Sequence, residues 1–145
     1  MKNSMKIYLA TTLDKENRAD MYNALKILRG AGFDVYAPVE HRIDHAWEYP
    51  NNEWGAMVFT ADVEAIKNSD CVVMISYGRY SSAGANWEAG YAFGIGKKVI
   101  VVEMTYNPMS LMVANGRYAS VRGLSGLEQY DWVNMPKTRT DTEQK

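Results

Sequence analysis

The stretch CVVMIS at residues 71–76 decides the fold of this chain. A continuous apolar run of this length, preceded by Asp70, is typical of the central strand of a parallel sheet, which is buried on both faces. The only cysteine of the chain, Cys71, is therefore interpreted as a packing residue of the core. Because ligands of such sheets bind beyond the carboxyl ends of the strands, we expect the chemistry of this protein to follow Ser76.

The segments on both sides of this strand alternate between strand and helix patterns. Before it, the sequence predicts a strand at residues 5–10, a helix through Met21, Leu25 and Leu28, a strand at residues 33–37 and a helix at residues 54–69. After it, the sequence predicts a helix around Glu88, a strand at residues 99–104, a short helix at residues 109–114, a short strand at residues 118–121 and a helical turn or lid at residues 127–132.

This alternation predicts an α/β fold: a single doubly wound domain with a flavodoxin-like five-stranded parallel sheet and helices on both faces. The strands enter their following loops after Ala10, Ala37, Ser76 and Met104. Because the carboxyl ends of parallel strands share one edge of the sheet, we expect these loops to surround one pocket.

Length and composition fit one domain. A chain of 145 residues with 47% hydrophobic content buries a substantial core. We place this domain at residues 1–135. The segment at residues 136–145 (PKTRTDTEQK) lacks apolar side chains, and we expect it to form a disordered tail.

The charge balance argues against large anionic partners. The formal net charge is -1 and the basic residues are scattered along the sequence, so we expect neither nucleic acid nor a membrane as a partner, but a small polar ligand. No apolar run approaches the roughly 20 residues that span a bilayer, and residues 1–4 are too short and polar for a secretory signal. A single cysteine favours a reducing compartment, so we expect a cytoplasmic protein.

A second stretch, SSAGANWEAGYAFG at residues 81–94, places one carboxylate, Glu88, among small residues where a loop becomes a helix. Gly84 permits close approach of a ligand, and Asn86 is available as the helix cap. Glu88 then lies in the first helical turn, where the macrodipole favours a carboxylate, and we expect it to be ionised at neutral pH.

The pattern leaves two interpretations of Glu88 open. An acidic residue in a first helical turn is often there only for the favourable dipole. An ionised carboxylate facing a buried pocket also suits attack on an anomeric carbon, which leaves a covalent glycosyl-enzyme intermediate. Asp62 lies near the apolar side of its predicted helix, where Asp is a poor residue, and a second carboxyl group there would serve the leaving group as a proton donor.

The polar stretch at residues 39–53 (VEHRIDHAWEYPNNE) shows no periodicity, and a loop this long inside a compact domain is more often functional than filler. It contains His41, Arg42 and His45; a solvated loop with incidental histidines is the other interpretation, and both stay open. The four-residue spacing of His41 and His45 would suit a metal site on a helix. Pro50 in the same stretch argues against a helix there, and a third ligand is missing. We therefore expect neither a metal nor a cofactor.

Together, four segments make the chain resemble the nucleoside 2-deoxyribosyltransferase family, which also contains the 2'-deoxynucleoside 5'-monophosphate N-hydrolases. The segments are KIYLA at residues 6–10, FTADVEAIKNSDCVV at 59–73, GANWEAGYAFGIGKKV at 84–99 and PMSLM at 108–112. The resemblance spans most of the chain and implies a flavodoxin-like enzyme.

The resemblance also implies roles for individual residues. Glu88 matches the family's nucleophile, in a segment that commonly reads GTxxELGYA, and Asp62 matches the acid that assists the departing base. Tyr8 matches the residue that orients the nucleophile. The family's transferases are oligomers, and the residue that a neighbouring subunit contributes to the site is matched here by Ser110.

Three positions depart from the transferase pattern. Ser82 stands where transferases usually carry an Asp, and Ser110 where they carry an Asn, as in the monophosphate hydrolases. Removing the Asp charge would favour a phosphate, and serine hydroxyls can donate to its oxygens. Arg42 aligns with the position at which the transferases commonly carry a Gln that recognises the nucleobase. Against the hydrolase branch, the loop from Thr11 lacks the glycine-rich phosphate segment of the animal hydrolases.

The expected function is cleavage of the N-glycosidic bond of a 2'-deoxynucleoside or its 5'-monophosphate. With a second nucleobase as acceptor the enzyme is a transferase, which is our leading interpretation; with water it is a hydrolase. A noncatalytic nucleotide-binding module on the same fold is the remaining alternative. The residues expected to bind the substrate are Ser82, Ser110, Arg42, Gly84, Asn86 and Thr11.

Overall fold

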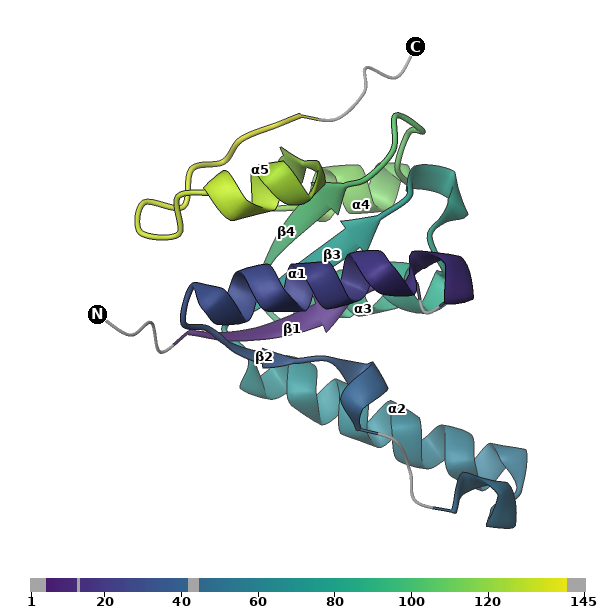
Figure 1. The fold of residues 1–145 in the computed structure, drawn as a ribbon. Helices are drawn as coiled ribbons and strands as arrows, with labels where there is room; N and C mark the ends of the chain where they lie inside the picture. Colours follow the sequence, from purple (N-terminus) through teal and green to yellow (C-terminus); the bar gives the residue numbers. More distant parts are fainter. Residues whose placement is uncertain (1–4, 13, 42–44, 141–145) are drawn as a thin grey trace.

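The computed structural model describes residues 5–12, 14–41 and 45–140. Within them lies one five-stranded parallel sheet with the strand order β2-β1-β3-β4-β5 (Figure 1). The strands are β1 (Lys6–Ala10), β2 (Asp34–Tyr36), β3 (Cys71–Ser76), β4 (Lys98–Glu103) and β5 (Ala119–Arg122). This arrangement confirms the predicted doubly wound α/β fold.

Helices cover both faces of the sheet (Figure 1). On one face lie α1 (Arg18–Gly30) and α5 (Gly123–Gln129). On the other lie α2 (Asn51–Asn68), α3 (Ala83–Gly94) and α4 (Leu111–Gly116). Successive strand residues point to opposite faces, so β1 to β4 contribute to both apolar cores, whereas β5 contributes only to the core on the α1 side.

The stretch from which the fold was predicted is the central strand. All six residues of β3 are buried, and β3 pairs with β1 on one side and with β4 on the other. Cys71 belongs to the core on the α1 side, as expected. Burial raises the pKa of its thiol to about 12, which keeps it protonated and unreactive.

The strand order reverses between β1 and β3, because the chain leaves β1 toward β2 and returns to pair β3 on the other side. The loops after β1 and β3 therefore meet at this point, which is where such folds bind ligands. The Ser82 amide donates to Thr12 Oγ1 at 2.8 Å and joins the two loops. The loop after β4 packs against the same region, where a side chain at Gly78 (φ 65°) would collide with Asn107.

Several boundaries differ from the sequence prediction. The stretch at residues 39–53 is only partly a loop, because short 3-10 turns form at Pro38–Glu40 and Ala46–Glu48. Helix α2 begins at Asn51 rather than at residue 54, immediately after Pro50, whose fixed φ suits a helix start. The last helix, α5, begins at Gly123, before the predicted turn at residues 127–132.

Residues 136–140, the first half of the segment expected to be a tail, run beside β5. The Ser120 amide donates to the Thr138 carbonyl at 2.9 Å, and Thr138 Oγ1 donates back to the Ser120 carbonyl at 2.9 Å. Residues 141–145 lie outside the described part of the chain, and the domain boundary at residue 135 stays a prediction.

Candidate active site

Glu88 lies on α3, which starts earlier than the sequence suggested. The cap of this helix is Ser82, whose Oγ accepts from the Ala85 amide at 3.1 Å, and the expectation of an Asn86 cap is wrong. Because α3 begins at Ala83, Glu88 lies in the second turn and not in the first. The macrodipole acts mainly within the first turn, so it contributes little to the state of this carboxylate.

Glu88 is instead held by a tyrosine from the central sheet. The Tyr8 phenol, fully buried on β1, donates a hydrogen bond to Glu88 Oε2, as the resemblance implied. Burial, followed by the adjacent Glu88 charge, strongly raises the pKa of Tyr8. Tyr8 therefore stays a neutral donor and fixes the orientation of the carboxylate.

The protonation of Glu88 differs from the expectation. Burial raises its pKa to about 7; the nearby Asp62 charge acts in the same direction, and the Tyr8 hydrogen bond opposes it. The expectation of full ionisation at neutral pH is wrong, because both forms are well populated near pH 7 in the unliganded protein.

Asp62, half-buried on α2, lines the same cavity as Glu88. This cavity has a volume of about 500 Å³ and lies between α2 and α3. Burial raises the pKa of Asp62, and His41 partly opposes the shift. A carboxyl group with a raised pKa is suited to proton donation, so the cavity holds two carboxyl groups of complementary use.

Aromatic side chains form much of the wall of this cavity. Trp54 and Phe59 come from α2 and Trp87 from α3, and all three are partly exposed. The rings of Phe59 and Trp87 lie 5.4 Å apart, and Trp87 stacks on Tyr91 at 5.4 Å. Flat apolar walls with few polar groups suit a planar ring such as a nucleobase.

These aromatic residues were not among the predicted site residues, although a signal was present. Trp54, Val58 and Asp62 follow one another at four-residue spacing, which places them on one face of α2. Thr12 was also missed. Its hydroxyl accepts the Ser82 amide, and only the fold brings these two residues together.

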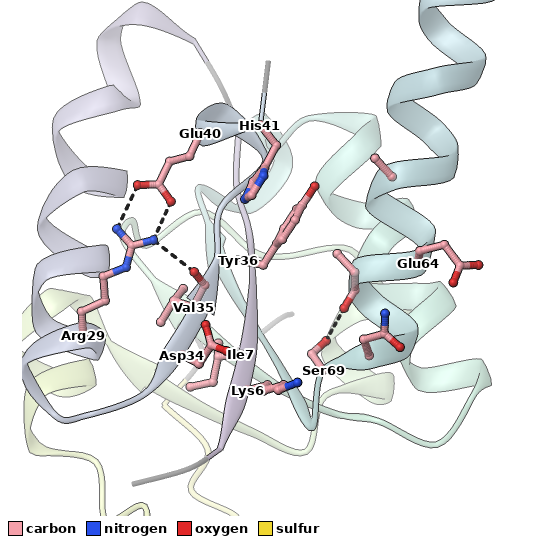
Figure 2. A pocket seen from close by; sticks show the side chains of 13 residues that line it. Lys6, Ile7, Arg29, Asp34, Val35, Tyr36, Glu40, His41, Glu64 and Ser69 are labelled. Carbon is pink, nitrogen blue, oxygen red and sulfur yellow. Dashed lines mark hydrogen bonds and ion pairs between the residues drawn. The ribbon is translucent and has the colours of Figure 1, made fainter. Parts of the chain in front are cut away.

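A larger hollow of about 590 Å³ lies beside the cavity, between β2 and α2, and contains neither Glu88 nor Asp62 (Figure 2). Figure 2 shows His41 stacked on Tyr36, with ring centroids 4.0 Å apart. Tyr36 in turn stacks on Tyr8 at 5.7 Å. This row of rings brings the start of the loop after β2 next to the site.

The remaining predicted residues are distributed unevenly. Gly84 lines the cavity of Glu88, and Thr11 is buried at the end of β1. Asn86 lines a different hollow, between α3 and α4. Ser110 caps α4, accepts from the Met112 amide at 3.2 Å and is exposed. Arg42 lies outside the described residues.

Comparison with known proteins identifies the family. The family model described as nucleoside 2-deoxyribosyltransferase matches residues 7–127. The chain belongs to this family. The family is named for the transfer of the 2-deoxyribosyl group of nucleosides, and the protein is an enzyme of this family. No match is found among curated proteins.

Solved structures agree with this assignment. A 2-deoxyribosyltransferase from the bacterium Bacillus psychrosaccharolyticus is 30% identical, with a TM-score of 0.84, over 92% of this chain and 97% of that protein. A conserved protein from Enterococcus faecalis V583 is 19% identical (TM-score 0.60; 97% and 92% covered), and the CMP N-glycosidase BcmB of Clostridium botulinum is 17% identical (TM-score 0.59; 86% and 95% covered). The last two share the fold.

Two further properties concern only the residues that the structure describes. Within the described residues, no group of three or more His, Cys, Asp or Glu side chains is placed to hold a metal ion. No helix in this part of the chain combines the length and the apolar character needed to cross a membrane.

Proposed function

We propose that this protein cleaves the N-glycosidic bond of a 2'-deoxynucleoside and passes the 2-deoxyribosyl group to another nucleobase, through a covalent intermediate on Glu88. The observation that carries the proposal is the shared cavity of Glu88 and Asp62, with Tyr8 bonded to Glu88. Membership of the family and the 30% identity to a 2-deoxyribosyltransferase over most of both chains support it.

In the first step, a Glu88 oxygen attacks C1' of the sugar while the bond from C1' to the base nitrogen breaks. The electron pair of that bond goes to the base, and the Asp62 carboxyl group supplies the proton that makes the base a neutral product. The transition state resembles an oxocarbenium ion, which the Glu88 carboxylate stabilises. The products are a free base and a 2-deoxyribosyl ester of Glu88.

In the second step, a nitrogen of the acceptor base attacks C1' and the ester bond to Glu88 breaks. Asp62, now a carboxylate, takes the proton that the acceptor nitrogen loses. The enzyme returns to its starting state without an external acid or base. Tyr8 acts as a positioning residue, because its hydrogen bond fixes Glu88 in both steps.

The first step requires opposite charge states of the two carboxyl groups. Glu88 must be ionised to attack, and Asp62 must be protonated to donate. Burial raises the pKa of both groups, and the Asp62 charge raises that of Glu88 further, so both carboxyl groups hold a proton more readily than an exposed carboxyl group does. Binding of a substrate that needs Asp62 as donor selects the productive arrangement.

A second candidate is a 2'-deoxynucleoside 5'-monophosphate N-hydrolase, with the same nucleophile and with water as acceptor. The observation that favours it is Ser82 at the start of α3, a helix of 12 residues. The free amides of such a helix end attract a phosphate, and Ser82 brings no negative charge to repel it. Thr12, bonded to the Ser82 amide, lies beside the same place.

We also propose that a second copy of this chain completes the site. Ser110 is followed by two highly exposed apolar side chains, Leu111 at 67% and Met112 at 83%. Met112 also lines the apolar hollow between α3 and α4, beside Phe93. Apolar side chains exposed together favour burial against another protein surface. A second copy docked there would carry its Ser110 toward a neighbouring cavity.

Chromatography of four reactions distinguishes these functions: deoxyadenosine and dAMP, each with and without cytosine. Deoxycytidine formed from deoxyadenosine plus cytosine is the result expected of the transferase. Free adenine and sugar phosphate formed from dAMP, with no reaction of deoxyadenosine, would establish the hydrolase instead. Glu88→Ala abolishes either activity, whereas Glu64→Ala, an exposed acid on α2, retains it. Absence of base release in all four reactions would contradict both functions.

A further inference from the structure

The edge of the sheet opposite the catalytic loops carries a concentration of positive charge. A hollow of about 290 Å³ lies where α3 and α4 end, next to the beginnings of β4 and β5. Its basic lining residues are Lys97, Lys98, Arg117, Lys137 and Arg139. Among the described residues, no Asp or Glu lines this hollow. Five of the 16 basic residues of a chain with net charge -1 therefore gather at one place.

The fold assembles this group from three separate segments. Lys97 and Lys98 follow α3, and Arg117 follows α4. Residues 137–139 run beside β5, held by the hydrogen bonds between Ser120 and Thr138. In an extended segment, alternate side chains point the same way, so Lys137 and Arg139 share one side and Thr138 faces the other.

Within the described residues, the contacts of Lys98, Lys137 and Arg139 position these three cations without neutralising them. The Nζ atoms of Lys98 and Lys137 lie 4.7 Å and 5.4 Å from the centre of the Tyr118 ring. Arg139 Nη1 donates to the Ala114 carbonyl at 3.0 Å, and Arg117 donates to the same carbonyl. An aromatic ring and a carbonyl orient positive charges, but they carry no formal charge of their own.

The ends of α3 and α4 offer an alternative reason for the cations. A helix C-terminus attracts positive charge with the strength of about half an elementary charge, so two helix ends supply about one negative charge. Lys97, Lys98, Lys137 and Arg139 alone bring four formal positive charges to the hollow, so most of their charge remains. In the described part of the chain, Lys97, Lys98, Lys137 and Arg139 form no ion pair with a carboxylate.

We propose that this hollow is a binding site for a small multivalent phosphate anion, separate from the cavity of Glu88. Several cations around one concave place suit an anion that carries several charges on neighbouring oxygens. The volume of about 290 Å³ lies just below the range of about 300–1,000 Å³ usual for whole organic ligands. The hollow therefore takes a phosphate chain, either inorganic or as the exposed end of a nucleoside triphosphate.

The test is isothermal titration calorimetry of the full chain with inorganic tripolyphosphate at low ionic strength. The hollow variant is Lys137→Gln/Arg139→Gln. The matched control is Lys15→Gln/Lys26→Gln, which removes the same charge from exposed positions outside the hollow. We expect the hollow variant to weaken binding about ten-fold or more and the control to change it less than about two-fold. A Glu88→Gln variant should bind tripolyphosphate as the wild type does.

Two further titrants, a nucleoside triphosphate and a single-stranded oligonucleotide, identify the source of the anion. A triphosphate that binds more tightly than tripolyphosphate, with the same loss in the hollow variant, assigns the site to nucleotides; equal affinities assign it to inorganic chains. Absence of tripolyphosphate binding, equal weakening in both double variants, loss of binding in Glu88→Gln, or binding of the oligonucleotide alone would each overturn the proposal.

Discussion

At the scale of single residues, the site depends on a contact between positions 80 residues apart in the sequence, Tyr8 and Glu88. The phenol is buried in the sheet and the carboxylate comes from a helix, so the sheet fixes the direction of the proposed nucleophile. The hydrogen bond also lowers the pKa of Glu88, against the effect of burial. Tyr8 thus influences both the orientation and the charge of Glu88.

Tyr8→Phe removes this hydrogen bond, and we expect kcat to fall about 10- to 100-fold, the usual effect of losing a hydrogen bond to a charged group. The pKa of Glu88 should rise, because the opposing influence on it is gone. The acidic limb of the kcat/KM profile then moves to higher pH. Tyr36→Phe, on the neighbouring stacked ring, is the control and should leave the limb in place. A limb that stays or moves to lower pH in Tyr8→Phe would refute the positioning role.

Asp62→Asn removes the proposed proton donor, and we expect kcat for deoxyadenosine to fall about 10²- to 10⁴-fold. A substrate whose leaving group departs without protonation should react with Asp62→Asn at nearly the wild-type rate in the first step. Burst kinetics with both substrates measure this difference. Glu64→Gln, two residues further along α2, is the matched control. Equal losses with both substrates would mean that Asp62 does not protonate the base.

Glu88→Gln tests the cost of burying this carboxyl group. An acid whose pKa is raised in the folded state destabilises that state at pH values above the unfolded pKa, and the full effect is present above the folded pKa. With a shift from 4.5 to about 7, Glu88→Gln should stabilise the protein by up to about 3 kcal/mol at about pH 8 and by little at about pH 5. Chemical denaturation at both pH values measures this. A stabilisation that is the same at both would assign it to packing.

At the scale of elements, the strands were predictable and the helix starts were not. The central strand β3 was predicted with its observed bounds, because burial on both faces leaves an uninterrupted apolar run. The start of α3 was misplaced, because Ser82 and Asn86 are both common caps and only the fold shows which one accepts the amide. That displacement moved Glu88 out of the first turn and changed the reason for its pKa.

The start of α3 is where we expect the choice between nucleoside and nucleotide to be made. Ser82→Asp keeps a good helix cap but adds a negative charge. It should lower kcat/KM for dAMP about ten-fold or more relative to deoxyadenosine, because the charge repels a 5'-phosphate. Ser82→Asn is the control, because Asn is a neutral helix cap of the same size as Asp. If Ser82→Asp leaves the ratio of kcat/KM for dAMP to kcat/KM for deoxyadenosine unchanged, the 5' group of the substrate does not bind at the start of α3.

At the scale of the whole molecule, the sequence predicted the sheet and the meeting of the loops after β1 and β3. The expectation that the loops after all four strands surround one pocket is wrong for the cavity of Glu88, because residues of α2 and α3 line it. The sequence also did not predict the surfaces to which several distant segments contribute. The basic residues appear scattered along the chain, yet the ends of α3 and α4 and residues 137–139 bring five of them to one hollow. The aromatic wall between α2 and α3 arises in the same way. Periodicity describes one element at a time, so surfaces shared by several elements escape it.

The whole account depends on a covalent bond between the sugar and Glu88. Rapid quenching of the enzyme with deoxyadenosine in the absence of an acceptor base, followed by peptide mass spectrometry, tests it most directly. The account predicts that a peptide containing Glu88 gains the mass of one 2-deoxyribosyl group, and that added cytosine removes this mass while deoxycytidine forms. Base release at the wild-type rate by Glu88→Ala, or the sugar bound to another residue, would contradict it.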